Sequence, residues 1–212
     1  MDEQAARAWL VETHDVSRGT LDRLDAFVAF LAQENERQNL VARSTLPSVW
    51  DRHIVDSAQL FHLGRNDGRW VDLGAGAGFP GLVIAALGGS VTLVEERRLR
   101  TEFLVHAAEI LGVSNRVEIV RGRGEAFQAP PFATIIARAF APLDRLFASA
   151  VHLAAPETRW VLPKGRNAKS ELEAAQASWQ GDFRLEPSVT DPDAMIIVAE
   201  RVRRRSKGNQ AR

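Results

Sequence analysis

The sequence contains no cysteine and no tyrosine among its 212 residues. Without cysteine, the chain can form no disulfide, no thiolate metal site and no iron–sulfur cluster, and it has no cysteine nucleophile. Without tyrosine, it lacks the phenolic acid or base on which some dehydrogenases depend. The five histidines share no metal-ligand spacing, so the sequence predicts no metal site.

Long apolar runs are missing as well. The longest, residues 79–87, is interrupted by Pro80 and Gly81 and is far shorter than a membrane span. The first four residues, Met-Asp-Glu-Gln, are acidic and do not resemble a secretion signal. We therefore expect a cytoplasmic protein that does not contact a membrane.

The chain has no excess of either charge, because 27 basic residues balance 27 acidic ones. The balance is uneven along the chain: residues 201–212 carry six basic groups and no acid, whereas residues 1–40 carry eight acids and four arginines. A zero net charge does not favour a protein that coats nucleic acid. Any RNA-binding surface is therefore expected to be local.

The spacing of apolar residues predicts three N-terminal helices, over 2–13, 20–34 and 45–63. From residue 69, short β-type runs alternate with helical ones, and the last two runs are joined by a loop. This pattern predicts an α/β, doubly wound, Rossmann-like fold: a seven-stranded, mostly parallel sheet with a C-terminal antiparallel hairpin. The expected strands are 70–73, 91–94, 117–120, 133–137, 159–162, 183–185 and 195–199, and the helices between them are 81–88, 97–111, 143–154 and 168–179.

These elements divide the chain into three parts. Residues 1–65 are predicted to form a helical extension packed on the core, and residues 66–202 the sheet domain. Residues 203–212 are basic and low in complexity, so we expect a disordered tail.

The most informative segment is a glycine-rich loop after the first predicted strand. Residues 71–81 read Val-Asp-Leu-Gly-Ala-Gly-Ala-Gly-Phe-Pro-Gly, so a strand leads into alternating glycines and then a helix. Such a loop lets a ligand lie against the backbone, and the free amides of the helix start attract an anion. The segment therefore predicts a nucleotide-type cofactor loop that includes Gly74 and Gly76.

Two cofactors fit this loop. Residues 76–81 satisfy the G-x-G-x-x-G fingerprint of dinucleotide binding. Three details favour S-adenosylmethionine over NAD: Asp72 lies two residues before the first glycine, a G-x-G-x-G core starts at the strand end, and no hydride-transfer residues follow.

Two further strand ends carry residues suited to a nucleotide cofactor. Glu95 ends the second strand, 21 residues after Gly74, where an acid can accept hydrogen bonds from both ribose hydroxyls. The third strand leads into Arg-Gly-Arg-Gly-Glu at 121–125, at the same sheet edge. We expect the backbone of Gly124 and Glu125 to contact the adenine. The alternative is that these strand-end residues are merely exposed to solvent.

Arg138 follows the fourth strand, in the crevice where such folds bind ligands. Its planar donor fork suits a methionine carboxylate, an RNA phosphate or a structural ion pair with Asp72 or Asp144. Lys164 ends the fifth strand on the same edge. We expect Arg123, Arg138 and Lys164 to cluster around one cleft suited to phosphate.

Seven short blocks, in this order along the chain, resemble a known family. It is the family of bacterial 16S rRNA guanine-N7 methyltransferases also called glucose-inhibited division protein B. The Arg-His-Ile-x-Asp-Ser block and the Gly-Phe-Pro-Gly end of the glycine loop are unusual among methyltransferases, which makes the resemblance specific. The blocks are residues 39–40, 52–57, 72–81, 102–104, 138–141, 164–165 and 171–172.

The resemblance implies transfer of a methyl group from S-adenosylmethionine to N7 of guanine 527, in the decoding-region loop of 16S rRNA. It also implies cofactor contacts by Gly74, Phe79, the 124–125 pair and Arg138. The implied partner is 16S rRNA or a small ribosomal subunit particle, and we expect the protein to act as a monomer.

Four residues are candidates for the RNA side of the site. Arg52 and His53 belong to the block on the third predicted helix, and Arg123 and Lys164 lie at strand ends. For His53, packing on a helix surface or in the core is the alternative to an RNA contact.

Guanine N7 has a free lone pair at neutral pH, so its methylation needs no general base, and we predict no catalytic residue. Catalysis would rest on holding N7, the methyl carbon and the sulfur in line. Two other classes stay open. One is an NAD-dependent oxidoreductase that uses the register at 76–81, and the other is a non-catalytic RNA-binding module.

Overall fold

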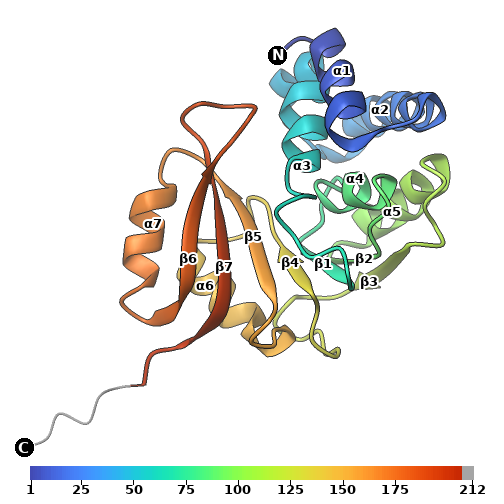
Figure 1. Ribbon diagram of the computed structural model, residues 1–212. Coiled ribbons are helices and arrows are strands. Elements are labelled where there is room, and N and C mark those ends of the chain that lie inside the picture. The colour runs from blue at the N-terminus through green and yellow to red at the C-terminus, as the bar shows by residue number, and fades with distance from the viewer. Residues whose placement is uncertain (207–212) are drawn as a thin grey trace, which may run out of the picture.

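A seven-stranded sheet forms the centre of the computed structural model, which describes residues 1–206 (Figure 1). The strand order is β3-β2-β1-β4-β5-β7-β6. Strands β1 to β5 are parallel, and β7 runs antiparallel to β5 and β6. The predicted α/β fold with a C-terminal hairpin is confirmed. The strands are β1 (Trp70–Leu73), β2 (Val91–Glu95), β3 (Val117–Arg121), β4 (Thr134–Ile136), β5 (Arg159–Lys164), β6 (Trp179–Pro187) and β7 (Met195–Arg204).

Two hydrophobic cores lie on the two faces of the sheet. Successive residues of a strand point to opposite faces, and the buried residues divide accordingly: Val161 joins one core, whereas Trp160 and Leu162 join the other. Helices α4 and α5 cover the first face, and α6 and α7 the second (Figure 1). The four helices are α4 (Gly81–Ala86), α5 (Arg98–Ile110), α6 (Leu143–Ala150) and α7 (Ala168–Ala175).

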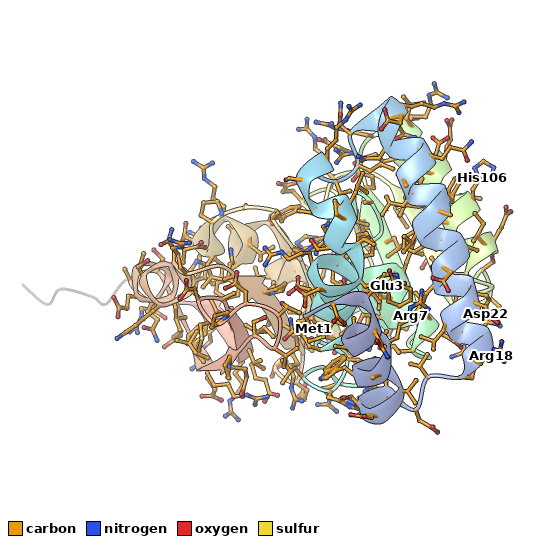
Figure 2. The ribbon with its side chains drawn as sticks, turned by 90° about the horizontal axis from the view of Figure 1, so that it is seen from above. Met1, Glu3, Arg7, Arg18, Asp22 and His106 are labelled. Carbon is orange, nitrogen blue, oxygen red and sulfur yellow. The ribbon has the colours of Figure 1, made fainter. Side chains whose placement is uncertain are left out.

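The N-terminal helices α1 (Glu3–His14) and α2 (Arg18–Gln38) pack on the first face. The Phe27 ring of α2 lies 5.5 Å from the Phe79 ring of the glycine loop, so the extension and the sheet share one core. Arg7 of α1 pairs with Glu3 and with Asp25 of α2, and Figure 2 shows Glu3 and Arg7 on α1 beside α2. The two helices are thereby held together at the surface as well as in the core.

The third predicted helix, over 45–63, is helical over residues 43–58 only, and it is not a regular α-helix. The segment is a 3₁₀ turn η1 (Arg43–Ser48), a π-helical turn η2 (Trp50–Val55) and a short α3 (Asp56–Ala58), followed by turns. Pro47 lies inside η1 and has no N–H for α-helical bonding. Single π-turns of this kind are frequent at functional sites.

The C-terminal hairpin is longer than predicted. Strand β7 includes Arg203 and Arg204, which pair with Gln180 and Trp179 of β6. The Arg204 guanidinium also lies 5.3 Å from the centroid of the Trp179 ring. The predicted disordered tail at 203–212 is therefore wrong at its start, and its last residues, 207–212, lie outside the described part of the chain.

No helix within residues 1–206 is both long and apolar enough to cross a membrane.

Candidate active site

The glycine loop leaves β1 in a conformation that favours glycine. Gly74 has a φ of +71°, and a Cβ atom there would lie 2.8 Å from the Phe140 ring. The Asp72 carboxylate accepts a 2.8 Å hydrogen bond from the Gly81 N–H, which fastens the start of α4 to β1. The end of the loop is therefore fixed, and Gly74 lies at the sheet edge.

The side chain of Asp72 is fully buried, and burial raises its pKa to about 7 against the opposing effects of the Gly81 N–H and the Arg138 charge. Within residues 1–206, its Oδ1 atom has no hydrogen-bond partner. Burying a carboxyl oxygen without a hydrogen bond is energetically unfavourable. Asp72 thus holds Gly81 with one oxygen and leaves Oδ1 unused beneath the loop.

A first cavity of about 400 Å³ lies at the carboxyl ends of β1, β2 and β3. Four of the predicted cofactor residues line it together, namely Gly74, Glu95, Gly124 and Glu125. Gly76 does not line this cavity, but its N–H donates to Glu95 Oε2 at 3.0 Å. The sequence thus identified four of the twelve lining residues, because parallel strand ends meet at one edge.

Glu95 is held in place by the backbone. Its Oε1 atom accepts a 2.9 Å bond from the Arg97 N–H, its Oε2 atom accepts from Gly76, and Arg100 lies 3.9 Å away. The carboxylate is nearly buried but borders the cavity, so its orientation is fixed before a ligand arrives. Its contact with a ribose stays a prediction.

Phe79 does not line this cavity. Its ring stacks on the imidazole of His53 with 5.0 Å between centroids, and it is 4% exposed. Phe79 therefore packs between the extension and the glycine loop, where it supports His53.

Arg138 is enclosed by the Arg-His-Ile-x-Asp-Ser block. Its Nη2 atom donates to His53 Nδ1 at 3.0 Å, and its Nη1 atom to Asp56 Oδ2 and to the Arg52 carbonyl, both at 3.4 Å. The predicted structural pairs with Asp72 or Asp144 are not formed. Asp144 accepts instead from the Trp179 indole at 2.8 Å.

His53 is a neutral hydrogen-bond relay. Burial, and after it the charges of Arg138 and Arg52, lower its pKa to about 3. Because Nδ1 accepts from Arg138, the proton is on Nε2, which donates to Thr45 Oγ1 at 2.8 Å. Thr45 in turn donates to the Ala42 carbonyl at 2.7 Å. The relay therefore fixes one edge of the Arg138 guanidinium.

Asp56 connects Arg138 to the loop between β6 and β7. Its Oδ1 atom accepts from Thr190 Oγ1 at 2.9 Å and from Gln59 Nε2 at 3.0 Å. Gln59 Oε1 accepts the Val189 N–H at 2.9 Å. Sequence reasoning missed Asp56 as a site residue, although its i,i+3 spacing from His53 is a helical same-face signal. No sequence signal pointed to Thr190.

A second cavity, of about 520 Å³, adjoins the first, and Ala139 and Phe140 belong to both walls. Arg52, Arg138 and Lys164 line it, as the sequence predicted for the last two. Arg123 does not: it lines the first cavity and pairs with Glu96 at 2.9 Å. The predicted single cluster is wrong for Arg123, because β3 lies on the far side of β1 from β4 and β5.

In the described part of the chain, no group of three or more His, Asp or Glu side chains could hold a metal ion.

Comparison with known proteins decides the family. The GidB family model, described as rRNA small subunit methyltransferase G, matches residues 20–191. The chain belongs to this family. Among GidB relatives, the ribosomal RNA small subunit methyltransferase G of Rhizorhabdus wittichii is 52% identical over 100% of this chain and 99% of its own. That of Novosphingobium aromaticivorans is 53% identical over 92% of this chain and 87% of its own.

Solved structures show the same fold in distant proteins. The glycopeptide N-methyltransferase MtfA, in complex with S-adenosylhomocysteine, has a TM-score of 0.61 and 14% identity, over 70% of the GidB chain and 89% of its own. An O-methyltransferase from Bacillus cereus, also with S-adenosylhomocysteine, has a TM-score of 0.59 and 15% identity, over 92% and 97%. The fold is therefore that of the Rossmann-like methyltransferases, and the family membership favours a methyltransferase over an oxidoreductase or a non-catalytic RNA-binding module.

Proposed function

We propose that this GidB-family protein transfers a methyl group from S-adenosylmethionine to N7 of guanine 527 of 16S rRNA, in the cytoplasm. The observation that carries the proposal is the pair of adjoining cavities at the carboxyl ends of the parallel strands. One suits a nucleoside cofactor, and the other, lined by three basic side chains that are each paired with a carboxylate of the same wall, suits an RNA base and its backbone. The family and its named relatives supply the substrate class.

The first cavity fits S-adenosylmethionine by its chemistry. Gly74 and Gly124 present backbone without side chains, and Glu95 presents a fixed carboxylate at the cavity wall. A carboxylate at the end of the second strand suits ribose hydroxyls. Glu125 borders the same cavity at the end of β3, where the adenine is expected.

The bound cofactor supplies a methyl group on a sulfonium: the N7 lone pair forms the new N–C bond as the C–S bond breaks and its electrons return to sulfur. No proton is lost, so the chain needs no base, and the neutral, fully engaged His53 agrees with this. The task of the protein is to hold the two reactants in line, which is worth up to roughly 7–11 kcal/mol in favourable systems.

Basic side chains around the second cavity would hold the RNA backbone. Arg52 is exposed at the rim, and Arg138 and Lys164 line the wall. Arg52 pairs with Asp191 at 3.4 Å, and an exposed pair of this kind is weak enough to exchange for a phosphate close to the target base. Such a contact agrees with a local recognition surface on a chain of zero net charge.

The test is to incubate the protein with S-adenosylmethionine and with ribosomal RNA or small-subunit particles from a strain that lacks this gene. Alkaline reduction and aniline cleavage, read by primer extension, then map 7-methylguanine in 16S rRNA. We expect one new stop, at guanine 527, that depends on the cofactor. Methyl transfer to another position or another atom would contradict the proposal, as would stabilisation against heat by NAD but not by S-adenosylmethionine.

A further inference from the structure

The second cavity contains an ion pair with unused hydrogen-bonding capacity. Lys164, the last residue of β5, donates to Glu171 Oε2 of α7 at 2.8 Å and to the Ala141 carbonyl at 3.0 Å. An ammonium group has three donors, so one remains available. Within residues 1–206, Glu171 Oε1 accepts no hydrogen bond from the protein, although the side chain is only 32% exposed.

The other carboxylates of this cavity are already engaged. Asp56 accepts from Thr190 and Gln59 on one oxygen and from Arg138 on the other. Asp191 accepts from the Asp193 N–H on Oδ1 and pairs with Arg52 through Oδ2. Among the described residues that line the cavity, Glu171 is thus the carboxylate with an open acceptor.

We propose that Lys164 and Glu171 read the Watson–Crick edge of the target guanine, an inference that rests on the proposed function. Guanine presents an acceptor, O6, beside two donors, N1–H and the N2 amino group. The free Lys164 donor matches O6, and the Glu171 carboxylate matches N1–H and N2–H. Adenine presents a donor at position 6 and an acceptor at N1, so the same pair rejects it.

This orientation leaves the reacting atom free. O6 lies between N7 and N1 on the base, so a protein that holds O6, N1 and N2 leaves N7 directed away from the ion pair. Phe140 belongs to the walls of both cavities and offers a half-buried ring on which the base stacks. Guanine held in this way points its N7 edge toward the wall shared with the cofactor cavity.

The test combines a change in the protein with a change in the RNA. Inosine lacks only the N2 amino group of guanine and keeps N7. Methyl-transfer rates are measured at saturating cofactor for the wild type and Glu171→Gln. The substrates carry guanine or inosine at the target position, as free 16S rRNA or as reconstituted particles, whichever the wild type methylates.

We expect the wild type to lose about 10- to 100-fold in kcat/KM on inosine, the size of a hydrogen bond to a charged group. Glu171→Gln loses at least a similar factor on guanine and a smaller factor on inosine, because inosine has already lost the N2–H bond and keeps only the N1–H bond to Glu171. The matched control is Glu173→Gln, which removes the same charge from an exposed position of α7 and keeps the full preference for guanine.

Three readings separate the possible failures. Losses that multiply independently in the combined case overturn the inference, and so does a Glu171→Gln rate on guanine equal to that of Glu173→Gln. If the ion pair binds the base, the S-adenosylhomocysteine affinity and the thermal midpoint of Glu171→Gln stay near those of the wild type. If both fall in proportion to the loss of rate, the ion pair has a structural role and the inference is overturned. A wild type that methylates no guanine substrate overturns the proposed function itself.

Discussion

The first cavity is lined mainly by residues at the ends of three neighbouring parallel strands, whereas the second is lined by residues that are distant in the sequence. Gly74 follows β1, Glu95 ends β2 and Gly124 follows β3. Arg138 is instead held by the extension, and the extension by the loop between β6 and β7, where Thr190 bonds to Asp56 across a sequence separation of 134 residues. Cofactor binding thus uses local geometry, whereas substrate binding depends on tertiary assembly.

The strongest test of this contrast is Arg138→Ala. The variant removes the donor that Asp56 and His53 share, and it leaves a half-buried carboxylate without its cation. We expect methyl transfer to fall about 100-fold, the size of a misplaced reactant, and stability to fall by about 2 kcal/mol. Steady-state kinetics and urea unfolding measure the two effects.

S-adenosylhomocysteine titration shows to which cavity Arg138 belongs. Affinity within about threefold of wild type assigns it to the second cavity, which it lines; a loss equal to the rate loss assigns it to the cofactor, as the family resemblance implies. Arg138→Lys keeps the charge but not the fork, and it should recover only part of the rate.

Gly74→Ala should damage the first cavity selectively. A Cβ there meets the Phe140 ring at 2.8 Å, and the φ of +71° strains any other residue by about 1–2 kcal/mol. We expect S-adenosylhomocysteine affinity to fall about tenfold or more, measured by calorimetry. Gly19→Ala is the control, because its Cβ meets the nearest side-chain atom at an ordinary 3.7 Å. Equal affinities for the two variants would show that the loop does not contact the cofactor.

His53 should make the second cavity sensitive to acid. Its pKa is about 3 in the folded protein and 6.5 in the unfolded chain, so the unfolded chain binds the proton first as pH falls. Stability from the neutral imidazole is complete above pH 6.5 and is lost progressively as pH falls toward 3, by about 2 kcal/mol at pH 5.

Urea unfolding at pH 7.5 and pH 5.0 measures this loss of stability. In His53→Gln, the difference in stability between the two pH values should be smaller by the contribution of His53. His14 is a useful comparison, because burial and then the His62 charge lower its pKa to about 4 in the extension, away from both cavities. His14→Gln should flatten the stability profile in the same way but leave kcat/KM at pH 7.5 unchanged. A kcat/KM at pH 7.5 in His53→Gln that equals the wild type would separate His53 from the site.

The smallest effect is expected for Arg123→Gln. The Arg123 side chain is 76% exposed at the rim of the first cavity and pairs with Glu96. If it contacts an RNA phosphate, the slope of log affinity against log salt falls by about one, while stability hardly changes. Filter binding across a salt series measures the slope, and an unchanged slope shows that RNA does not reach this rim.

The sequence predicted what depends on local pattern. Strand ranges such as 70–73 and 91–94 follow from β-type runs, and the cofactor wall follows from the rule that parallel strand ends share an edge. The sequence could not predict the π-helical turn at 50–55, because this segment packs between the extension and the sheet, and no local pattern shows that packing. Basic residues at 203–204 resembled a tail, but pairing with β6 makes them a strand.

The hydrogen bond between Asp56 and Thr190 ties the loop between β6 and β7 to the interior of the protein. Hairpin loops usually accept insertions and new chain ends without harm, yet this loop is bonded to the segment that holds Arg138. A circular permutant opened between β6 and β7 would keep the sheet intact and still release the guanidinium. The length of this loop is therefore constrained by the chemistry of the site rather than by the hairpin it closes.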